Sequence, residues 1–154
     1  MRLFSWIARR RASAFDMAET ATPPATAIVE NSGLDGLYLG LAVQSHLAWK
    51  QRLRTVVREG RHDAVDVAEL AADDLCALGQ WLHGTARARY GHLPQFARLR
   101  KAHAEFHLTA AQVVLLSRQA QRAAAQALLR GAFDSLSDRV QLELVRLHSA
   151  ARAQ

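Results

Sequence analysis

Apolar residues recur at intervals of three and four along the chain after residue 32, and no segment alternates like a strand. This spacing predicts amphipathic helices, because a 3.6-residue period places the apolar positions on one face. The short loops between them favour antiparallel neighbours, so we expect an all-α fold, an antiparallel four-helix bundle. The predicted helices cover about residues 35–59, 63 or 65–90, 94–130 and 135–152.

Residues that start and stop helices mark these bounds. Asn31, Ser32 or Asp35 could cap the first helix, and Gly60 is expected to end it. Gly91-His92-Leu93-Pro94 separates the second helix from the third, and the proline suits a first helical turn. Gly131 is interpreted as the stop between the third and fourth helices.

The predicted inner faces combine apolar residues with three histidines and the sole cysteine. Gly79 lies in the middle of the second helix, at a cost of about 1 kcal/mol relative to alanine, and permits close approach of another backbone or of something bound. The inward positions, helix by helix, are Leu39, Ala42, Val43, His46, Trp49, Leu53, Val56 and Val57; Ala68, Ala72, Leu75, Cys76, Gly79, Leu82 and Ala86, flanked by Leu78 and Trp81; Phe96, Leu99, His103, Phe106, His107, Ala110, Val113, Val114 and Ser117; and Leu136, Val140, Leu144 and Leu147.

Residues 1–32 are expected to form a flexible N-terminal tail and linker, separate from a helical bundle over residues 33–154. The Pro23-Pro24 pair indicates an extended, solvated stretch. Residues 1–11 mix apolar side chains with arginines and could touch a partner or a membrane surface, although a disordered tail is the simpler interpretation. The arginines follow the apolar patch, which is the reverse of the order in a secretory signal.

Composition narrows the class of protein. The chain has 154 residues, half of them apolar, which suffices for one domain with a core. It has no apolar stretch long enough to span a membrane, and one cysteine cannot form an intramolecular disulfide, so we expect a cytoplasmic protein. The net charge of +6 raises the possibility of nucleic-acid binding. The charges alternate along helix faces, however, and no recognition pattern is present, so no nucleic-acid partner is expected.

His46, Cys76, His103 and His107 lie on the inner faces of three different predicted helices. His103 and His107 are four residues apart, so both rings project from one face. Three imidazoles and one thiolate fill a tetrahedron, which suits Zn²⁺. Each residue alone has an ordinary explanation, as a hydrogen-bonded core histidine or a small buried thiol. Together they favour a shared metal, because three buried histidines would otherwise each need a partner.

A zinc ion at these ligands also needs acceptors for the imidazole nitrogens that do not bind it. Glu105, Asp73, Asp74 and backbone carbonyls are the candidates, and the sequence does not choose among them. Trp49 and Trp81 either shield the site or are ordinary core aromatics. The other histidines are expected at helix ends or on the surface: His62, His83, His92 and His148.

Three separated blocks resemble the chemoreceptor zinc-binding domain family of bacteria, and the spacing between the blocks fits as well. The resemblance covers roughly residues 34–152. It implies a helical bundle that is usually a homodimer and a sensory or regulatory module attached to chemoreceptors or diguanylate cyclases. It also implies one zinc ion held by three histidines and one cysteine. The blocks are His46-x-x-Trp49-Lys50, Cys76-x-Leu78-Gly79-x-Trp81 and Leu99-x-x-x-His103-x-x-Phe106-His107.

The expected function is therefore modulation of bacterial signalling, of the chemotaxis or cyclic-di-GMP type. The sequence contains no receptor coiled coil and no Gly-Gly-Asp/Glu-Glu-Phe signature, so the signal is expected to pass in trans or through a dimer rearrangement. Two alternatives remain: a structural zinc staple, and a sensor of hypochlorous acid through the zinc-bound Cys76, which the resemblance implies. A zinc hydrolase is disfavoured, because it needs an open coordination position and the chain has no His-Glu-x-x-His. No enzyme activity is expected.

Overall fold

The computed structural model describes residues 33–34, 37–61 and 65–154, and most of these residues are helical, as predicted. Two short strands, β1 (Gly33–Leu34) and β2 (Leu37–Tyr38), pair antiparallel with Leu34 opposite Leu37. Both leucines are buried. The predicted tail over residues 1–32 lies outside the described part of the chain, so it stays a prediction.

The first long helix is α2 (Leu39–Glu59), which starts later than predicted because the strand pair occupies the preceding residues. Its N-terminal flanking residue, Tyr38, makes no side-chain capping bond. The predicted stop at Gly60 is confirmed. This glycine has φ 69°, a left-handed conformation that suits glycine, and its N–H donates to the Val56 carbonyl.

The second predicted helix is wrong as a single element, since the structure breaks it into α3 (Val67–Ala71), α4 (Ala77–His83) and α5 (Thr85–Tyr90). The backbone turns extended at Ala72 and again at Cys76, and Gly84 breaks it a second time. These breaks shift the phase of the buried face. Ala68 and Leu75, predicted to point inward, are therefore exposed, whereas Leu70 is buried.

The boundary between the third and fourth predicted helices is also wrong. Helix α6 (Pro94–Arg118) begins at Pro94 as predicted but ends well before residue 130. The chain reverses over residues 119–121, where Ala120 takes the positive φ of 59°.

The last helical stretch then comprises α7 (Arg122–Leu128), a π-helical turn η2 (Leu129–Phe133) and α8 (Asp134–Arg152) without a break. Gly131 lies inside this stretch and stops nothing. Its neighbours Leu129 and Phe133 are buried, so the apolar face continues past the glycine.

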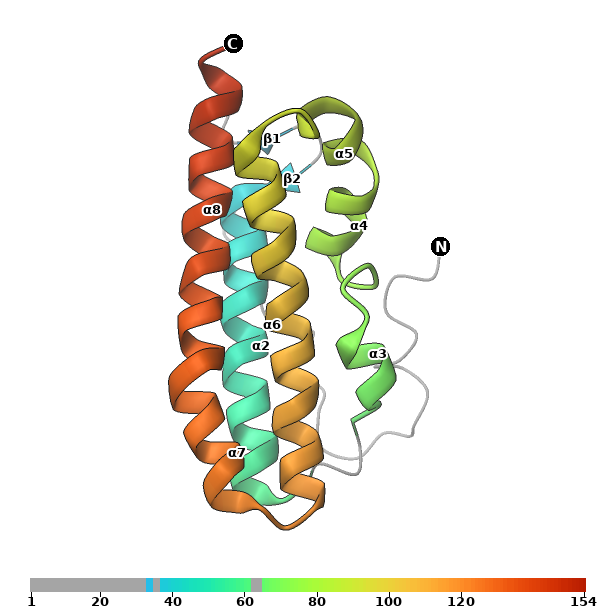
Figure 1. The fold of residues 1–154 in the computed structure, drawn as a ribbon, viewed down its shortest axis with the longest axis vertical. Helices are drawn as coiled ribbons and strands as arrows, with labels where there is room; N and C mark the ends of the chain where they lie inside the picture. Colours follow the sequence, from blue (N-terminus) through green and yellow to red (C-terminus); the bar gives the residue numbers. More distant parts are fainter. Residues whose placement is uncertain (1–32, 35–36, 62–64) are drawn as a thin grey trace, which may run out of the picture. The chain divides into compact units, whose positions relative to one another are not determined.

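Chain direction alternates along the helical segments: α2 runs one way, α3 to α5 return, α6 repeats the direction of α2, and α7 to α8 return again (Figure 1). Helix α6 has its most extensive contacts with α8 and α3. The core therefore centres on α6, and its most buried residues include Leu99, Val113 and Val114 of α6 and Leu144 and Leu147 of α8. Every inward position predicted between Phe96 and Ser117 is buried.

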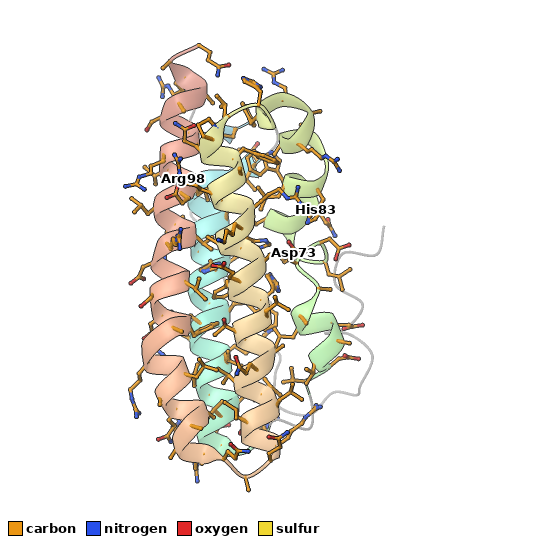
Figure 2. All side chains as sticks on the ribbon, viewed as in Figure 1. Asp73, His83 and Arg98 are labelled. Atoms are coloured by element: carbon orange, nitrogen blue, oxygen red, sulfur yellow. The ribbon has the colours of Figure 1, made fainter. Side chains whose placement is uncertain are left out.

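Ion pairs lie beside this core, both between helices and within α8. Lys50 of α2 lies 3.2 Å from Asp134 of α8. Glu143 of α8 is only 3% exposed and meets both Arg98 of α6, at 3.2 Å (labelled in Figure 2), and Arg146, at 2.8 Å. A buried carboxylate needs such partners, because an unpaired charge in the interior is costly. Among the described residues, no helix is long and apolar enough to cross a membrane.

Candidate metal centre

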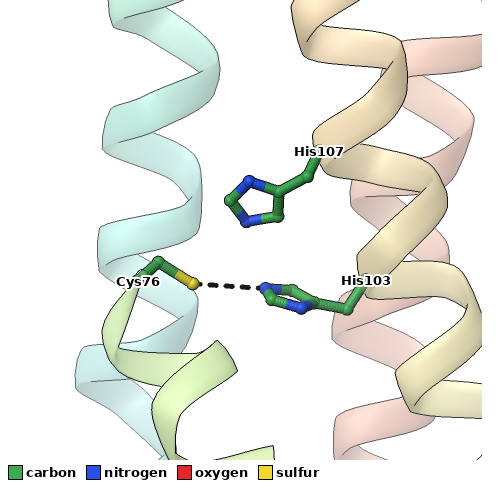
Figure 3. A group of neighbouring side chains, drawn as sticks. All are labelled: Cys76, His103 and His107. Carbon is green, nitrogen blue, oxygen red and sulfur yellow. Dashed lines mark hydrogen bonds between the residues drawn. The ribbon is translucent and has the colours of Figure 1, made fainter. Parts of the chain in front are cut away.

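Three of the four predicted ligands lie together between α4 and α6. Cys76, His103 and His107 each offer one ligand atom, and these atoms all lie within 4.8 Å of one another (Figure 3). The Cys76 Sγ atom is 3.3 Å from Nε2 of His103. Donor atoms bound to one tetrahedral zinc ion, at about 2.0–2.3 Å, would lie roughly 3.3–3.8 Å apart. The group is therefore close to the spacing of a zinc ligand set.

Cys76 owes its position to the break before α4. It is the residue that precedes the helix, in an extended conformation, and its Sγ accepts a hydrogen bond of 3.2 Å from the Gly79 N–H. Burial raises the pKa of the Cys76 thiol above its usual value, while the N–H groups of Gly79 and Leu78 lower it. A nearby cation would favour the thiolate further by electrostatic attraction. The thiolate is also the form of cysteine that binds a metal ion.

His103 and His107 project from successive turns of α6, with ring centroids 4.7 Å apart. Both are buried, with 1% and 9% of their surface exposed. The Nδ1 of His107 lies 2.8 Å from the Leu70 carbonyl, so this nitrogen carries the proton and donates it there. Nε2 of His107 then has a free electron pair, which is the state a metal ligand needs.

Burial keeps these imidazoles neutral. Desolvation, followed by the neighbouring His107, lowers the pKa of His103 to about 3. Desolvation also lowers the pKa of His107, against the opposing effect of the Leu70 carbonyl. Protons therefore compete little for these nitrogens at neutral pH, so lone pairs are available for a metal ion.

Comparison with known protein families gives one match to this region. Residues 46–114 match the model of the chemoreceptor zinc-binding domain. This part of the chain belongs to that family. The comparisons with curated proteins and with solved structures gave no match.

The domain is thus a zinc-binding signalling domain by family, and its half-buried Cys76 and buried His103 and His107 fit a zinc ion. One sulfur and two neutral imidazoles are borderline-soft donors that Zn²⁺ accepts. The Leu70 carbonyl already supplies the acceptor that a zinc-bound His107 requires. All four predicted ligands lie within the matched residues.

His46 is the predicted ligand that lies outside the group of three. Its Nε2 is buried and has no hydrogen-bond partner among the described residues. Its ring lies 4.1 Å from that of Phe106, and burial together with the nearby His107 lowers its pKa to about 4. A buried imidazole nitrogen with no partner beside three donors is what a fourth ligand would leave without its metal. Its role as a ligand stays a prediction.

Of the three predicted carboxylate acceptors, one faces the site and two do not. Glu105 pairs with Lys101 at 3.8 Å on the surface of α6, away from the imidazoles, and Asp74 is exposed. Asp73 is the carboxylate that faces the site: its Oδ2 lies 4.0 Å from His103 Nδ1. Nε2, the other nitrogen of the His103 ring, faces the Cys76 sulfur.

Backbone carbonyls were among the candidate acceptors, but the sequence did not point to Leu70 at the end of α3, because one continuous second helix was expected. One feature of the sequence marks the start of α3. Asp66-x-x-Glu69 is a helix-start pattern, and Asp66 indeed accepts hydrogen bonds from the N–H groups of Ala68 and Glu69. Trp81 is buried and packs against Tyr90, with ring centroids 6.1 Å apart. A shielding role for Trp49 and Trp81 stays a prediction.

Proposed function

We propose that this domain binds one Zn²⁺ through Cys76, His103, His107 and His46, and that the bound metal regulates a bacterial signalling protein in trans. The grouping of a cysteine sulfur with two neutral imidazoles inside the fold carries the proposal. His46 supplies the fourth donor by a movement of its ring toward the other three. When bound, zinc supplies a redox-inert crosslink between chain segments.

The chain's own residues prepare the site for this ion. The Leu70 carbonyl holds the His107 tautomer, and the Gly79 N–H directs the Cys76 sulfur. Burial keeps the histidines deprotonated, so the main proton that must leave is that of the thiol. Zinc binding is therefore coupled to release of the Cys76 proton, and occupancy falls in acid.

Regulation follows from where the ligands lie. Cys76 belongs to the broken segment that contains α3, α4 and α5, whereas His103 and His107 belong to the central helix α6. A shared ion ties the broken segment to α6 and, through His46, to α2. Loss of the ion frees these segments to shift, which alters the surface offered to a second copy or to a signalling partner.

A sensor is favoured over a structural staple by the size of the apolar core. Leu99, Val113, Val114, Leu144 and Leu147 are fully or almost fully buried, and they form a core that does not depend on the metal ligands. A domain that needs zinc to fold has a much smaller core. The zinc-free protein is therefore expected to stay folded and to exchange its metal reversibly.

We propose a homodimer as the working form, with a chemoreceptor or a diguanylate cyclase as the signalling partner. The family's description as a chemoreceptor domain supports this class of partner. The four-helix arrangement and the cytoplasmic location are part of the same proposal.

Oxidant sensing at Cys76 is a second candidate, and the burial of the thiol favours a metal-dependent version of it. The raised pKa keeps the metal-free thiol protonated and unreactive. A zinc-bound thiolate is the species that hypochlorous acid would attack, and oxidation of the sulfur would release the metal. Catalysis is not proposed, because four protein ligands leave no position for a reacting water.

X-ray absorption at the zinc edge of the loaded protein tests the ligand set. One sulfur at about 2.3 Å and three nitrogens at about 2.0 Å are expected. A water oxygen in place of one nitrogen would contradict the four-ligand proposal and would reopen a catalytic role.

Amide hydrogen exchange with and without zinc tests the regulatory step. We expect zinc to slow exchange in residues 67–90 and in α2, while the centre of α8 stays unchanged. Equal exchange of the two forms in all three ligand-bearing segments would contradict regulation by zinc.

A further inference from the structure

Asp73 stands between an exposed histidine and a buried predicted ligand. Its Oδ2 lies 3.2 Å from Nε2 of His83 and 4.0 Å from Nδ1 of His103. His83 is the last residue of α4, and Figure 2 labels Asp73 and His83 on the same side of the fold. About a quarter of the Asp73 side chain is exposed, against 1% for His103. The carboxylate thus connects the surface with the interior.

Nδ1 of His103 lacks the acceptor that its neighbour His107 already has. It is buried and makes no hydrogen bond within the described part of the chain. Because Nε2 of the same ring faces the Cys76 sulfur, Nδ1 must carry the proton when Nε2 binds a metal. A buried N–H without an acceptor costs about 1–3 kcal/mol. The Asp73 carboxylate is the acidic group in reach of it.

Gly79 holds the backbone of Asp73 in place. A Cβ atom at Gly79 would lie 1.7 Å from the carbonyl oxygen of Asp73 and 3.1 Å from the Cα of Asp74. The loop that contains Asp73 therefore packs directly on α4 at Gly79, because only glycine has no Cβ atom at this position. His83, one turn further along α4, holds the side chain of the same aspartate. Two contacts from α4 thus hold both the backbone and the side chain of Asp73.

We propose that Asp73 is the positioning residue for His103: it accepts the Nδ1–H bond that orients this imidazole toward the metal, and His83 and Gly79 hold it there. This inference rests on the proposed zinc function. A closing movement of about 1 Å brings the pair from 4.0 Å to hydrogen-bond distance. Metal binding at Nε2 drives this closure, because it fixes the proton on Nδ1 and makes it more acidic.

The arrangement gives the two ligands on α6 different supports. His107 donates to a backbone carbonyl, which no side-chain substitution removes, whereas His103 depends on a side chain. Asp73 is also the point at which the surface can act on the metal. A partner that engages the exposed His83 would draw on the same carboxylate oxygen that orients His103.

The test compares Asp73→Ala with Glu105→Ala. Both variants remove one carboxylate, but Glu105 pairs with Lys101 on the surface of α6, away from the imidazoles. Zinc affinity is measured by competition with a chromophoric chelator, and the melting temperature of each zinc-free protein is recorded. Asp73→Ala is expected to raise the zinc Kd by about 10- to 100-fold, the usual effect of losing such a partner. Glu105→Ala is expected to leave the Kd within about twofold.

Nuclear magnetic resonance of the zinc-loaded chain gives a readout that a purely structural role would not move. The Nδ1–H proton of His103 is expected as a protected, downfield signal in the wild type and in Glu105→Ala. It should be lost, or should exchange rapidly, in Asp73→Ala. Asp73→Asn keeps the size of the side chain and one acceptor oxygen, and should give an intermediate Kd. This second variant carries the test if Asp73→Ala does not fold.

The outcomes separate this inference from the proposed function. A wild-type chain that binds no zinc overturns both. A chain that binds zinc through Cys76 but shows the wild-type Kd and an unchanged His103 proton in Asp73→Ala overturns the role of Asp73 alone. An equal loss of affinity in Glu105→Ala also overturns it, because the effect would then be one of general charge.

Discussion

At the scale of single residues, Gly79 lies against the backbone of the Asp73 loop and leaves no space for a side chain. Helix propensity alone would make alanine the better residue in α4 by about 1 kcal/mol. We predict the opposite for Gly79→Ala: a loss of about 1–3 kcal/mol in the free energy of unfolding, because the added methyl group meets a carbonyl oxygen. Urea denaturation of the zinc-free protein measures it.

Gly131→Ala is the matched control, since a Cβ at this helical glycine meets nothing within 4 Å. It should raise the free energy of unfolding by up to about 1 kcal/mol. Equal effects of the two substitutions would contradict the close packing of α4 on the loop.

The buried His46 predicts how the zinc-free protein responds to acid. Burial lowers its pKa from 6.5 to about 4, so the unfolded chain takes up a proton at His46 at a higher pH than the folded chain does. The contribution of the neutral His46 to the free energy of unfolding is therefore fully present above pH 6.5 and is lost as the pH falls from 6.5 toward 4. His103 acts in the same direction, toward about pH 3. Thermal melting of the chelated protein at several pH values measures this loss.

His46→Leu should make the pH dependence shallower. Because leucine also removes a buried nitrogen that has no hydrogen-bond partner, the zinc-free variant should be at least as stable as the wild type at pH 7. The exposed His92→Gln serves as control and should keep the wild-type slope. A His46→Leu variant with the wild-type slope would contradict the buried placement of His46.

At the scale of elements, the reversal between α6 and α7 is centred on Ala120, at φ 59°. A non-glycine residue in this conformation costs about 1 kcal/mol or more. Ala120→Gly is therefore predicted to raise the free energy of unfolding by about 0.5–1 kcal/mol, measured by chemical denaturation. Ala123→Gly, at an exposed position in α7, should lower it by about 1 kcal/mol. If Ala120→Gly were as destabilising as Ala123→Gly, the chain would not turn at residues 119–121.

Every position that helical periodicity predicted on the inner face of α6 is buried, and the predicted α2 positions whose burial is described are buried or half-buried. A long helix keeps a constant phase between its apolar stripe and the core. Periodicity failed where the chain changes phase. Cys76 was predicted inside a helix, yet it precedes one, and its sulfur reaches the site from an extended residue. Gly131 was taken as a stop, yet a π-helical turn carries the buried face past it. Residue type alone does not distinguish these cases, because tertiary packing decides them.

The grouping of three predicted ligands was more predictable than the helices that carry them. Cys76, His103 and His107 do come together, because His103 and His107 share a helix face whatever happens elsewhere. The sequence named Asp73 and backbone carbonyls among the candidate acceptors but could not choose among them, since the positions of Leu70 and Asp73 depend on the break between α3 and α4. His46 keeps its predicted burial but lies outside the group of three.

At the scale of the whole molecule, the large apolar core around α6 predicts that removing zinc does not unfold the domain. Mild chelation should leave a cooperative thermal transition, and added zinc should raise the melting temperature with the logarithm of its excess over Kd. Circular dichroism before and after chelation measures this. Loss of the transition on chelation would instead identify zinc as a structural staple.

The central claim is that one zinc ion is held by Cys76 with the three buried histidines. The most direct measurement is zinc per chain, by elemental analysis after zinc loading and dialysis, in the wild type, Cys76→Ser, His46→Leu and the control His92→Gln. The account predicts one zinc per chain in the wild type and in His92→Gln, and a large loss in Cys76→Ser and His46→Leu. No zinc in the wild type, or full zinc in Cys76→Ser, would contradict it.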